Sequence, residues 1–344
     1  MQEDFKIQDS AGELRRDRKY FSRIGMMFFL GTMLIIVVQG AAIFLVSWLK
    51  PEWLEDSTIS LLVTSLPLYL LAMPLMILLI TRVKPRKVIS QKRMSAGQMA
   101  VAFLMSYAIL YVSNLLGNFI TILIGLIKGS GVGNVLADAV FGTNPWVIFF
   151  LMVLCAPVFE EFIFRKLLID RAAVYGEGVA VVLSGVMFGL FHGNLNQFAY
   201  AFLLGIFFGF IYVKTGKIRY TVILHMVINF MGSVVSTWVM NAMNAEKTIE
   251  ALQLFQSNPE EGMAALQSVL PGLLLVGIYV LLIFGVVIAG IVLLIVKRRK
   301  FRLMPGEVVI PKGKRFQTVM VNLGMGLFSV FWIVQMVWQL LQPA

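Results

Sequence analysis

Charged residues are scarce in this sequence. Asp, Glu, Lys and Arg make up 14% of the 344 residues, whereas 59% are hydrophobic. A soluble domain devotes about a quarter of its residues to charge, so an ordinary soluble fold is excluded. The single cysteine, Cys155, excludes an internal disulfide, and no Cys/His cluster has zinc-finger spacing. Histidine is also rare, because His192 and His225 are the only two.

The sequence is rich instead in long apolar stretches. A membrane-spanning helix needs roughly 20 mainly apolar residues, and seven stretches meet this length: Ile24–Leu49, Ile59–Ile80, Gln98–Ile127, Asn144–Leu168, Thr221–Met243, Val269–Val296 and Gln317–Leu341. Two shorter stretches, Gly178–His192 and Asn196–Val213, flank a tight polar turn and are predicted to form a helical hairpin. We therefore expect an all-α polytopic transmembrane bundle of eight or nine membrane helices.

Basic residues alternate between the loops in a way that predicts orientation. With the N-terminus inside, only Lys50, Lys128 and Lys247 of the 29 Lys and Arg residues fall outside. Basic residues collect on the cytoplasmic side of membrane proteins, so the N-terminus is predicted to be cytoplasmic. The net charge of +11 is thereby explained by topology, and no nucleic acid partner is expected. The lipid bilayer is the predicted environment, and we expect a bacterial plasma membrane.

Ionisable residues inside a membrane span are costly and are therefore candidates for function. The fourth stretch contains Glu160, Glu161 and Arg165. Glu161 and Arg165 are four residues apart, so they can pair on one helix face. Adjacent residues diverge by about 100°, which leaves Glu160 free to face a cavity and act as a general base for water. The alternative is that both glutamates only pair with basic residues near the inner interface.

The two histidines lie in other apolar stretches. His192 ends the first arm of the hairpin, four residues after Phe188, and His225 precedes Asn229 by the same spacing in the next span. His225 and Asn229 can together donate to an oxyanion or ligate a cation. Ordinary packing and interhelical hydrogen bonding remain the alternatives at both places. Glycines at every fourth residue should let the hairpin arms pack closely: Gly185, Gly189, Gly193, Gly205 and Gly209.

Depth in the membrane tests whether these groups can meet. On straight helices, Glu160 lies about 16 Å before Arg171, and His225 about 9 Å past Arg219. On the same arithmetic, His192 lies about 22 Å past Glu177. Convergence of the three side chains therefore requires tilted helices or a shallow hairpin.

The three segments together resemble the CAAX-prenyl-endopeptidase and bacteriocin-processing (CPBP, or ABI) family of intramembrane proteases. That family is characterised by the motifs Glu-Glu-x-x-x-Arg, Phe-x-x-x-His and His-x-x-x-Asn on successive membrane helices. Here they correspond to Glu160-Glu161-x-x-x-Arg165, Phe188-x-x-x-His192 and His225-x-x-x-Asn229. The resemblance covers roughly residues 144–240. The family includes the endopeptidases that trim prenylated CAAX proteins.

The resemblance implies a role for each motif residue. Glu160 and His192 would activate the attacking water, while His225 and Asn229 would stabilise the tetrahedral oxyanion. Glu161 and Arg165 would hold the site together. Members are often called metalloproteases, and His192 and His225 would be the ligands if Zn²⁺ were bound. The absence of a His-Glu-x-x-His pair favours a metal-independent mechanism.

A polar stripe in the third span adds a candidate substrate groove, formed by Tyr107, Tyr111, Asn114 and Asn118. Interhelical hydrogen bonding is the alternative interpretation. The chain is expected to divide into an N-terminal part with three membrane helices (1–143), the catalytic core (144–243), and an outer loop with two last helices (244–344). The outer loop is predicted either to lie as a helix on the membrane surface or to be a solvated connector.

These observations favour an intramembrane endopeptidase acting on a membrane-associated peptide or lipidated protein. The alternative is a non-proteolytic scaffold or bacteriocin-immunity protein with the same fold. A transporter is a third possibility, although no repeat favours it.

Overall fold

Apolar segments dictate the architecture, because backbone polar groups in a bilayer must be satisfied within helices. The computed structural model describes residues 6–7, 11–133, 140 and 142–342. Within this part of the chain, eight helical segments are long and apolar enough to cross a membrane. The predicted all-α polytopic bundle is therefore confirmed, and the chain is a multi-pass membrane protein. The remaining regular structure is a two-residue parallel pair in which Lys6 and Ile7 lie opposite Val308 and Val309.

The N-terminal half of the chain forms long helices joined by short turns. In order, the elements are β1 (Lys6–Ile7), α1 (Ala11–Leu49), a 3-10 turn (Pro51–Leu54), α2 (Ser57–Pro67), a π-helical turn (Leu68–Ala72), α3 (Met73–Thr81), α4 (Ala96–Lys128), α6 (Pro145–Ile148), a π-helical turn (Phe149–Cys155), α7 (Ala156–Glu161), a π-helical turn (Phe162–Leu167), α8 (Leu168–Ala172) and a 3-10 turn (Ala173–Tyr175).

The second half continues with the hairpin and the last spans. Its elements are α9 (Glu177–Phe191), α10 (Leu195–Thr215), α11 (Ile218–Asn229), a π-helical turn (Phe230–Val235), α12 (Ser236–Met243), α13 (Ala245–Ser257), α14 (Pro259–Val296), a 3-10 turn (Arg298–Lys300), β2 (Val308–Val309), a 3-10 turn (Lys312–Lys314), α15 (Arg315–Val319) and α16 (Leu323–Leu341).

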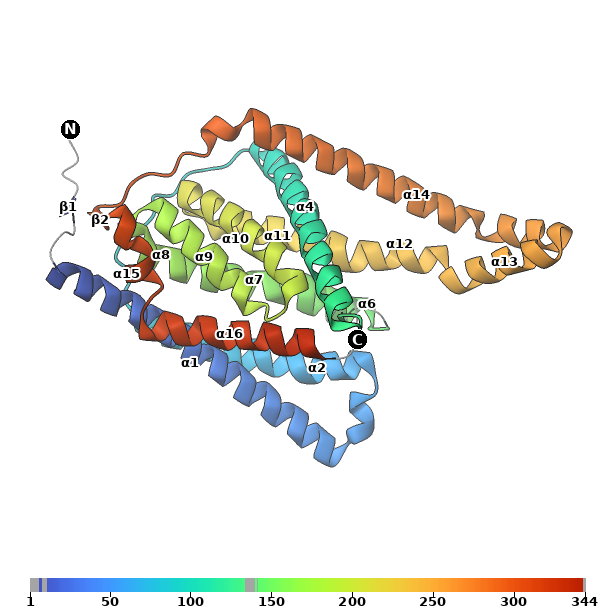
Figure 1. Cartoon of the computed structure of the whole chain (residues 1–344), viewed down its shortest axis with the longest axis horizontal. Coiled ribbons are helices and arrows are strands. Elements are labelled where there is room, and N and C mark those ends of the chain that lie inside the picture. The colour runs from blue at the N-terminus through green and yellow to red at the C-terminus, as the bar shows by residue number, and fades with distance from the viewer. Residues whose placement is uncertain (1–5, 8–10, 134–139, 141, 343–344) are drawn as a thin grey trace.

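Each predicted membrane stretch corresponds to an observed helical segment, usually longer than predicted. The fourth predicted span, Asn144–Leu168, continues to Tyr175, and this segment changes helix type five times. In the hairpin, α10 has 21 residues and is long enough to span, whereas α9 has only 15. The predicted outer loop is helical: it folds into α13 and the start of α14, which pack together and extend away from the bundle with α12 (Figure 1).

The helices pack around two apolar cores. The first is built by α1, α3, α8, α9 and α16, and the second by α4, α10 and α11 with side chains from α14. The hairpin of α9 and α10 joins them, because α9 contributes to the first core and α10 to the second. In Figure 1 the pair lies at the centre of the bundle, with α1 and α16 on one side and α4 on the other.

Glycines make the hairpin tight, as the small-residue spacing predicts. A Cβ on Gly185 would lie 2.7 Å from a side-chain carbon of Ile206 and 2.9 Å from the carbonyl oxygen of Phe202. A Cβ on Gly205 would lie 2.9 Å from the Cα of Gly185. The two backbones therefore approach too closely for any side chain, and this contact fixes the position of the α9 end that carries His192.

A long connection between α14 and α15 contacts the turn that precedes α9. Its Met304 exchanges backbone and side-chain hydrogen bonds with Glu177 at the start of α9. Gly306 packs against the backbone of Gly176, where any Cβ would overlap neighbouring main-chain atoms. Glu307 forms an ion pair with Lys87, with Nζ and Oε1 3.1 Å apart. The connection thereby fixes the turn from which α9 enters the bundle.

Candidate active site

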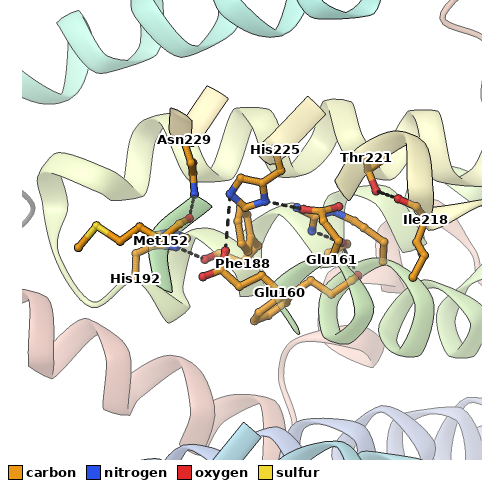
Figure 2. A network of polar contacts seen from close by, with 12 residues as sticks. Met152, Glu160, Glu161, Phe188, His192, Ile218, Thr221, His225 and Asn229 are labelled. Carbon is orange, nitrogen blue, oxygen red and sulfur yellow. Dashed lines mark hydrogen bonds and ion pairs between the residues drawn. The ribbon is translucent and has the colours of Figure 1, made fainter. Parts of the chain in front are cut away.

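The polar motif residues meet at a cavity of about 400 Å³ between the two cores. Its polar lining includes Glu160, His192, His225 and Asn229, which come from α7, the end of α9 and α11. Figure 2 shows these side chains converging around Phe188. Apolar side chains form the rest of the wall, so charges inside the cavity are less screened than in water.

The helix that carries Glu160 has two wide turns, and proline accounts for the first. Pro157 has no N–H, and its ring would clash with the carbonyl of Val153 in a regular α-helix. The π-helical turn Phe149–Cys155 directly precedes it, and the N–H of Ala156 donates to Leu151, five residues back. The second wide turn is Phe162–Leu167. Such turns are frequent at functional sites because they displace side chains from the regular helical faces.

Glu161 and Arg165 form the ion pair that their spacing predicts. Nε of Arg165 lies 3.1 Å from Oε2 of Glu161, and both side chains are fully buried. Nη1 of Arg165 donates to the hydroxyl of Ser184 at 2.9 Å, and the guanidinium lies 4.4 Å from the centroid of the Phe188 ring. A buried charge must be paired and hydrogen-bonded to be tolerated. This network meets that need and ties α7 to α9.

The same carboxylate orients His225. Nδ1 of His225 lies 3.1 Å from Oε1 of Glu161. A carboxylate paired with arginine can only accept, so Nδ1 carries a proton and Nε2 faces the cavity side. There Nε2 lies 3.7 Å from Oε2 of Glu160, which is beyond direct hydrogen bonding. Glu161 thus fixes the imidazole, while Glu160, with 15% of its side chain exposed, keeps its oxygens available.

His192 is oriented by the backbone rather than by a carboxylate. Its Nδ1 lies 2.8 Å from the carbonyl oxygen of Phe188, one helical turn earlier. A carbonyl can only accept, so Nδ1 carries the proton and the neutral ring has an acceptor at Nε2. The Phe188 ring packs edge-on against both imidazoles, at 4.8 Å from His192 and 5.9 Å from His225. Phe188 therefore spaces the two histidines.

Asn229 lines the cavity one turn after His225. Its Nδ2 donates to the carbonyl oxygen of Met152 at 2.8 Å (Figure 2). The amide has two N–H groups, so one stays available as a donor.

The polar stripe on α4 divides between three environments. Tyr111 and Asn114 line the cavity. Tyr107 does not line it but lies buried beside Tyr111, with the ring centroids 5.0 Å apart. Asn118 also lies outside the cavity and donates to Asn114 Oδ1 at 2.9 Å. The cavity therefore reaches two of the four residues of the predicted groove, and the substrate groove itself stays a prediction.

Sequence reasoning missed several neighbours of the site. Ser184 accepts a hydrogen bond from Arg165. The ring centroids of Phe208 and His225 lie 5.9 Å apart. Tyr200 and Gln197 line the cavity. Ser184 precedes Phe188 by four residues, so it shares the helix face of the motif and that spacing could have indicated it. The others come from α10, which contains no motif residue.

Arg171 does not mark a water interface, so counting residues from it gives the wrong depth for Glu160. Arg171 is 3% exposed, and its Nη1 donates to the carbonyl of Leu167 at 2.7 Å. Wide turns between residues 149 and 167 also break the regular rise assumed for Glu160. The three groups consequently line one cavity although straight helices would separate them.

The donors present do not make a metal site. Among the described residues, no group of three or more His, Cys, Asp or Glu side chains is placed to hold a metal ion. A zinc site that activates water normally has three protein ligands.

Comparison with known proteins gives a family match within the chain. Residues 142–231 match the family model described as type II CAAX prenyl endopeptidase Rce1-like. The matched segment contains all three motifs and supports assignment to the CPBP/CAAX protease family. No curated protein and no solved structure matches the chain.

Proposed function

We propose that this chain, which belongs to the CPBP (CAAX protease) family, is an intramembrane endopeptidase that hydrolyses a peptide bond of a membrane-associated protein or peptide. The observation that supports this most directly is the difference between two adjacent carboxylates: that of Glu161 is held by its partners, and that of Glu160 faces the cavity. Glu161 is fully buried between Arg165 and His225, whereas Glu160 lines the cavity, with its Oε2 3.7 Å from Nε2 of His225. A general base needs such an available carboxylate.

The partners of the histidines support different roles for them. His192 presents an unprotonated Nε2 to the cavity, so it can accept a hydrogen bond from water together with Glu160. His225, when it carries a second proton, donates from Nε2 while its Nδ1 stays bonded to Glu161. The second N–H of Asn229 provides another donor. Donors placed where charge develops stabilise an oxyanion in a poorly solvated site.

The proposed reaction follows from these roles. Water attacks the carbonyl carbon and gives its proton to Glu160, while His225 and Asn229 donate to the oxyanion. When the tetrahedral intermediate collapses, the C–N bond breaks and Glu160 returns the proton to the leaving amine. A carboxylate that first accepts and then donates a proton balances the cycle.

The family and the cavity together suggest the kind of substrate. A CAAX-type peptide or a lipidated protein would present its scissile bond from the membrane, and most of the lining is apolar. Tyr111 and Asn114 on α4 would contact the peptide opposite the catalytic groups. We place this chemistry near the cytoplasmic face, because the basic loops predict that orientation.

Replacement of Glu160 by Gln tests the proposal. Membrane-associated peptides are compared by mass spectrometry between cells that produce the wild-type protein and cells that produce Glu160→Gln. Cleavage products should disappear in the variant, while protein level and thermal stability stay normal. Glu260→Gln, on the exposed start of α14, is the matched control and should leave the products unchanged. Full processing by a folded Glu160→Gln protein would show that the protein acts by another route, such as binding a partner.

A further inference from the structure

The carbonyl of Met152 lacks its regular donor within its own helix. In the π-helical turn Phe149–Cys155, the N–H of Ala156 donates to the carbonyl of Leu151, five residues back. In the same register, residue 157 would donate to Met152. That residue is Pro157, which has no N–H. Met152 is half-buried and lines the mostly apolar cavity, where a carbonyl without a donor is costly, so another group should supply one.

Asn229 supplies that donor from a different helix. Its Nδ2 lies 2.8 Å from the Met152 carbonyl oxygen. Because a carbonyl cannot donate, the nitrogen side of the amide must face Met152 and the oxygen side must face away. Ser233, one turn later, donates to the main-chain carbonyl of Asn229 at 2.6 Å and leaves the side-chain amide unaffected. The orientation of this amide is therefore set by a vacancy in the neighbouring helix.

We propose that Pro157 is a positioning residue: by leaving the Met152 carbonyl free, it orients the Asn229 amide toward its role in the cavity. This inference rests on the proposed function for its catalytic consequence, although the hydrogen bond itself does not. An alanine at position 157 would bring an N–H into competition for Met152. Asn229 would then lose its anchor, and its second N–H would no longer be held in one direction.

Exchange of the side-chain amide protons tests the orientation directly. The purified full-length protein, labelled with ¹⁵N-asparagine in lipid nanodiscs, is measured by NMR, and the Asn229 signal is assigned by its loss in Asn229→Asp. In the wild-type protein, one Asn229 amide proton should exchange more slowly than those of exposed Asn241. Pro157→Ala should remove this difference, whereas Pro271→Ala, in α14, should preserve it. Fast exchange in the wild type, or slow exchange in a folded Pro157→Ala protein, would overturn the proposal.

A double-mutant cycle keeps the proposal testable even if Pro157→Ala folds poorly. Asn229→Leu removes the donor to Met152 and should lower the thermal midpoint. Adding Pro157→Ala in that background supplies a backbone N–H and should recover part of the loss. Residues that share one hydrogen bond give such non-additive effects. Additive losses in the double variant would mean that Pro157 and Asn229 act independently, and would overturn the proposal.

Turnover of the peptides cleaved by the wild-type protein gives the catalytic readout. Loss of one oxyanion donor lowers kcat by roughly 100-fold or more, which is the expectation for Asn229→Ala. Pro157→Ala should lower kcat by less than that with little change in KM, and it should add nothing to Asn229→Ala. Independent losses in the double variant would contradict the positioning role. If the wild-type protein cleaves nothing, the proposed function fails, while the exchange and stability measurements still decide the role of Pro157.

Discussion

Oε1 of Glu161 lies 3.1 Å from Nδ1 of His225, while the other oxygen of the same carboxylate lies 3.1 Å from Nε of Arg165. One buried carboxylate thus balances a cation and orients an imidazole at the same time. Its neighbour Glu160 lines the cavity instead. Two glutamates that are adjacent in sequence are therefore expected to respond differently to the same substitution.

The first prediction concerns the stability of these two variants. Glu161→Gln keeps the size of the side chain but leaves the buried Arg165 without its counter-charge. Breaking a buried ion pair in this way costs about 3–5 kcal/mol. Thermal unfolding in detergent should show a clearly lower midpoint for Glu161→Gln and a nearly unchanged one for Glu160→Gln. Equal midpoints for the two variants would contradict the assigned division of roles.

The second prediction separates the two nitrogens of His192. In His192→Asn, the side-chain amide nitrogen replaces Nδ1 and can still donate to the carbonyl of Phe188, but nothing replaces Nε2. We expect normal thermal stability together with loss of peptide cleavage, measured on membranes that carry equal amounts of protein. His192→Gln serves as the comparison, since it extends toward the Nε2 position. Retained cleavage by His192→Asn would remove Nε2 from the mechanism.

The third prediction concerns the contact between α9 and α10. A Cβ on Gly185 would lie 2.7 Å from Ile206 Cγ1 and 2.9 Å from the carbonyl oxygen of Phe202, so Gly185→Ala should force the helices apart. Overpacking of this kind costs about 1–3 kcal/mol. Gly326→Ala is the control, because nothing lies within 4 Å of the added atom. The thermal midpoint should fall for Gly185→Ala and stay level or rise for Gly326→Ala.

The fourth prediction tests the wall formed by α4. Asn114 lines the cavity, whereas Asn118 lies outside it. If the peptide contacts this wall, Asn114→Ala should raise KM with a smaller effect on kcat, because binding lost equally in ground and transition states appears in KM. Asn118→Ala should have the weaker effect of the two. Steady-state cleavage of an identified peptide product distinguishes them, and an unchanged KM in Asn114→Ala would exclude the contact.

Much of the fold was predictable because membrane spans depend on length and apolar composition alone. Each predicted stretch corresponds to an observed helix, and the tight hairpin follows from its glycine spacing. The ion pair of Glu161 and Arg165 was predictable for a similar reason, since residues four apart meet on any α-helix. These features are local in sequence.

What could not be predicted depends on how the helices cross. Counting along straight helices put His192, His225 and Glu160 at different depths, yet all three line one cavity. Wide turns displace side chains from their regular helical faces. Arg171 is buried, so it does not mark the membrane boundary that its charge predicted. The partner of Asn229 was hidden for another reason: it is a main-chain carbonyl, and side-chain patterns do not indicate which carbonyl is free. Pro157, which has no N–H, was the feature of the sequence that could have indicated this free carbonyl.

The contact between the first and the last helix has a consequence for how the protein is made. Gly324 donates its N–H to Ser22 Oγ at 3.1 Å, and the carbonyl of Val321 accepts from Arg18 at 2.7 Å, so α16 docks on α1 across some 300 positions of the chain. During synthesis, α1 enters the membrane long before its partner has been translated. The first core therefore stays incomplete until α16 has been translated, and insertion must tolerate an uncovered α16-facing surface of α1 while all the helices between them are made.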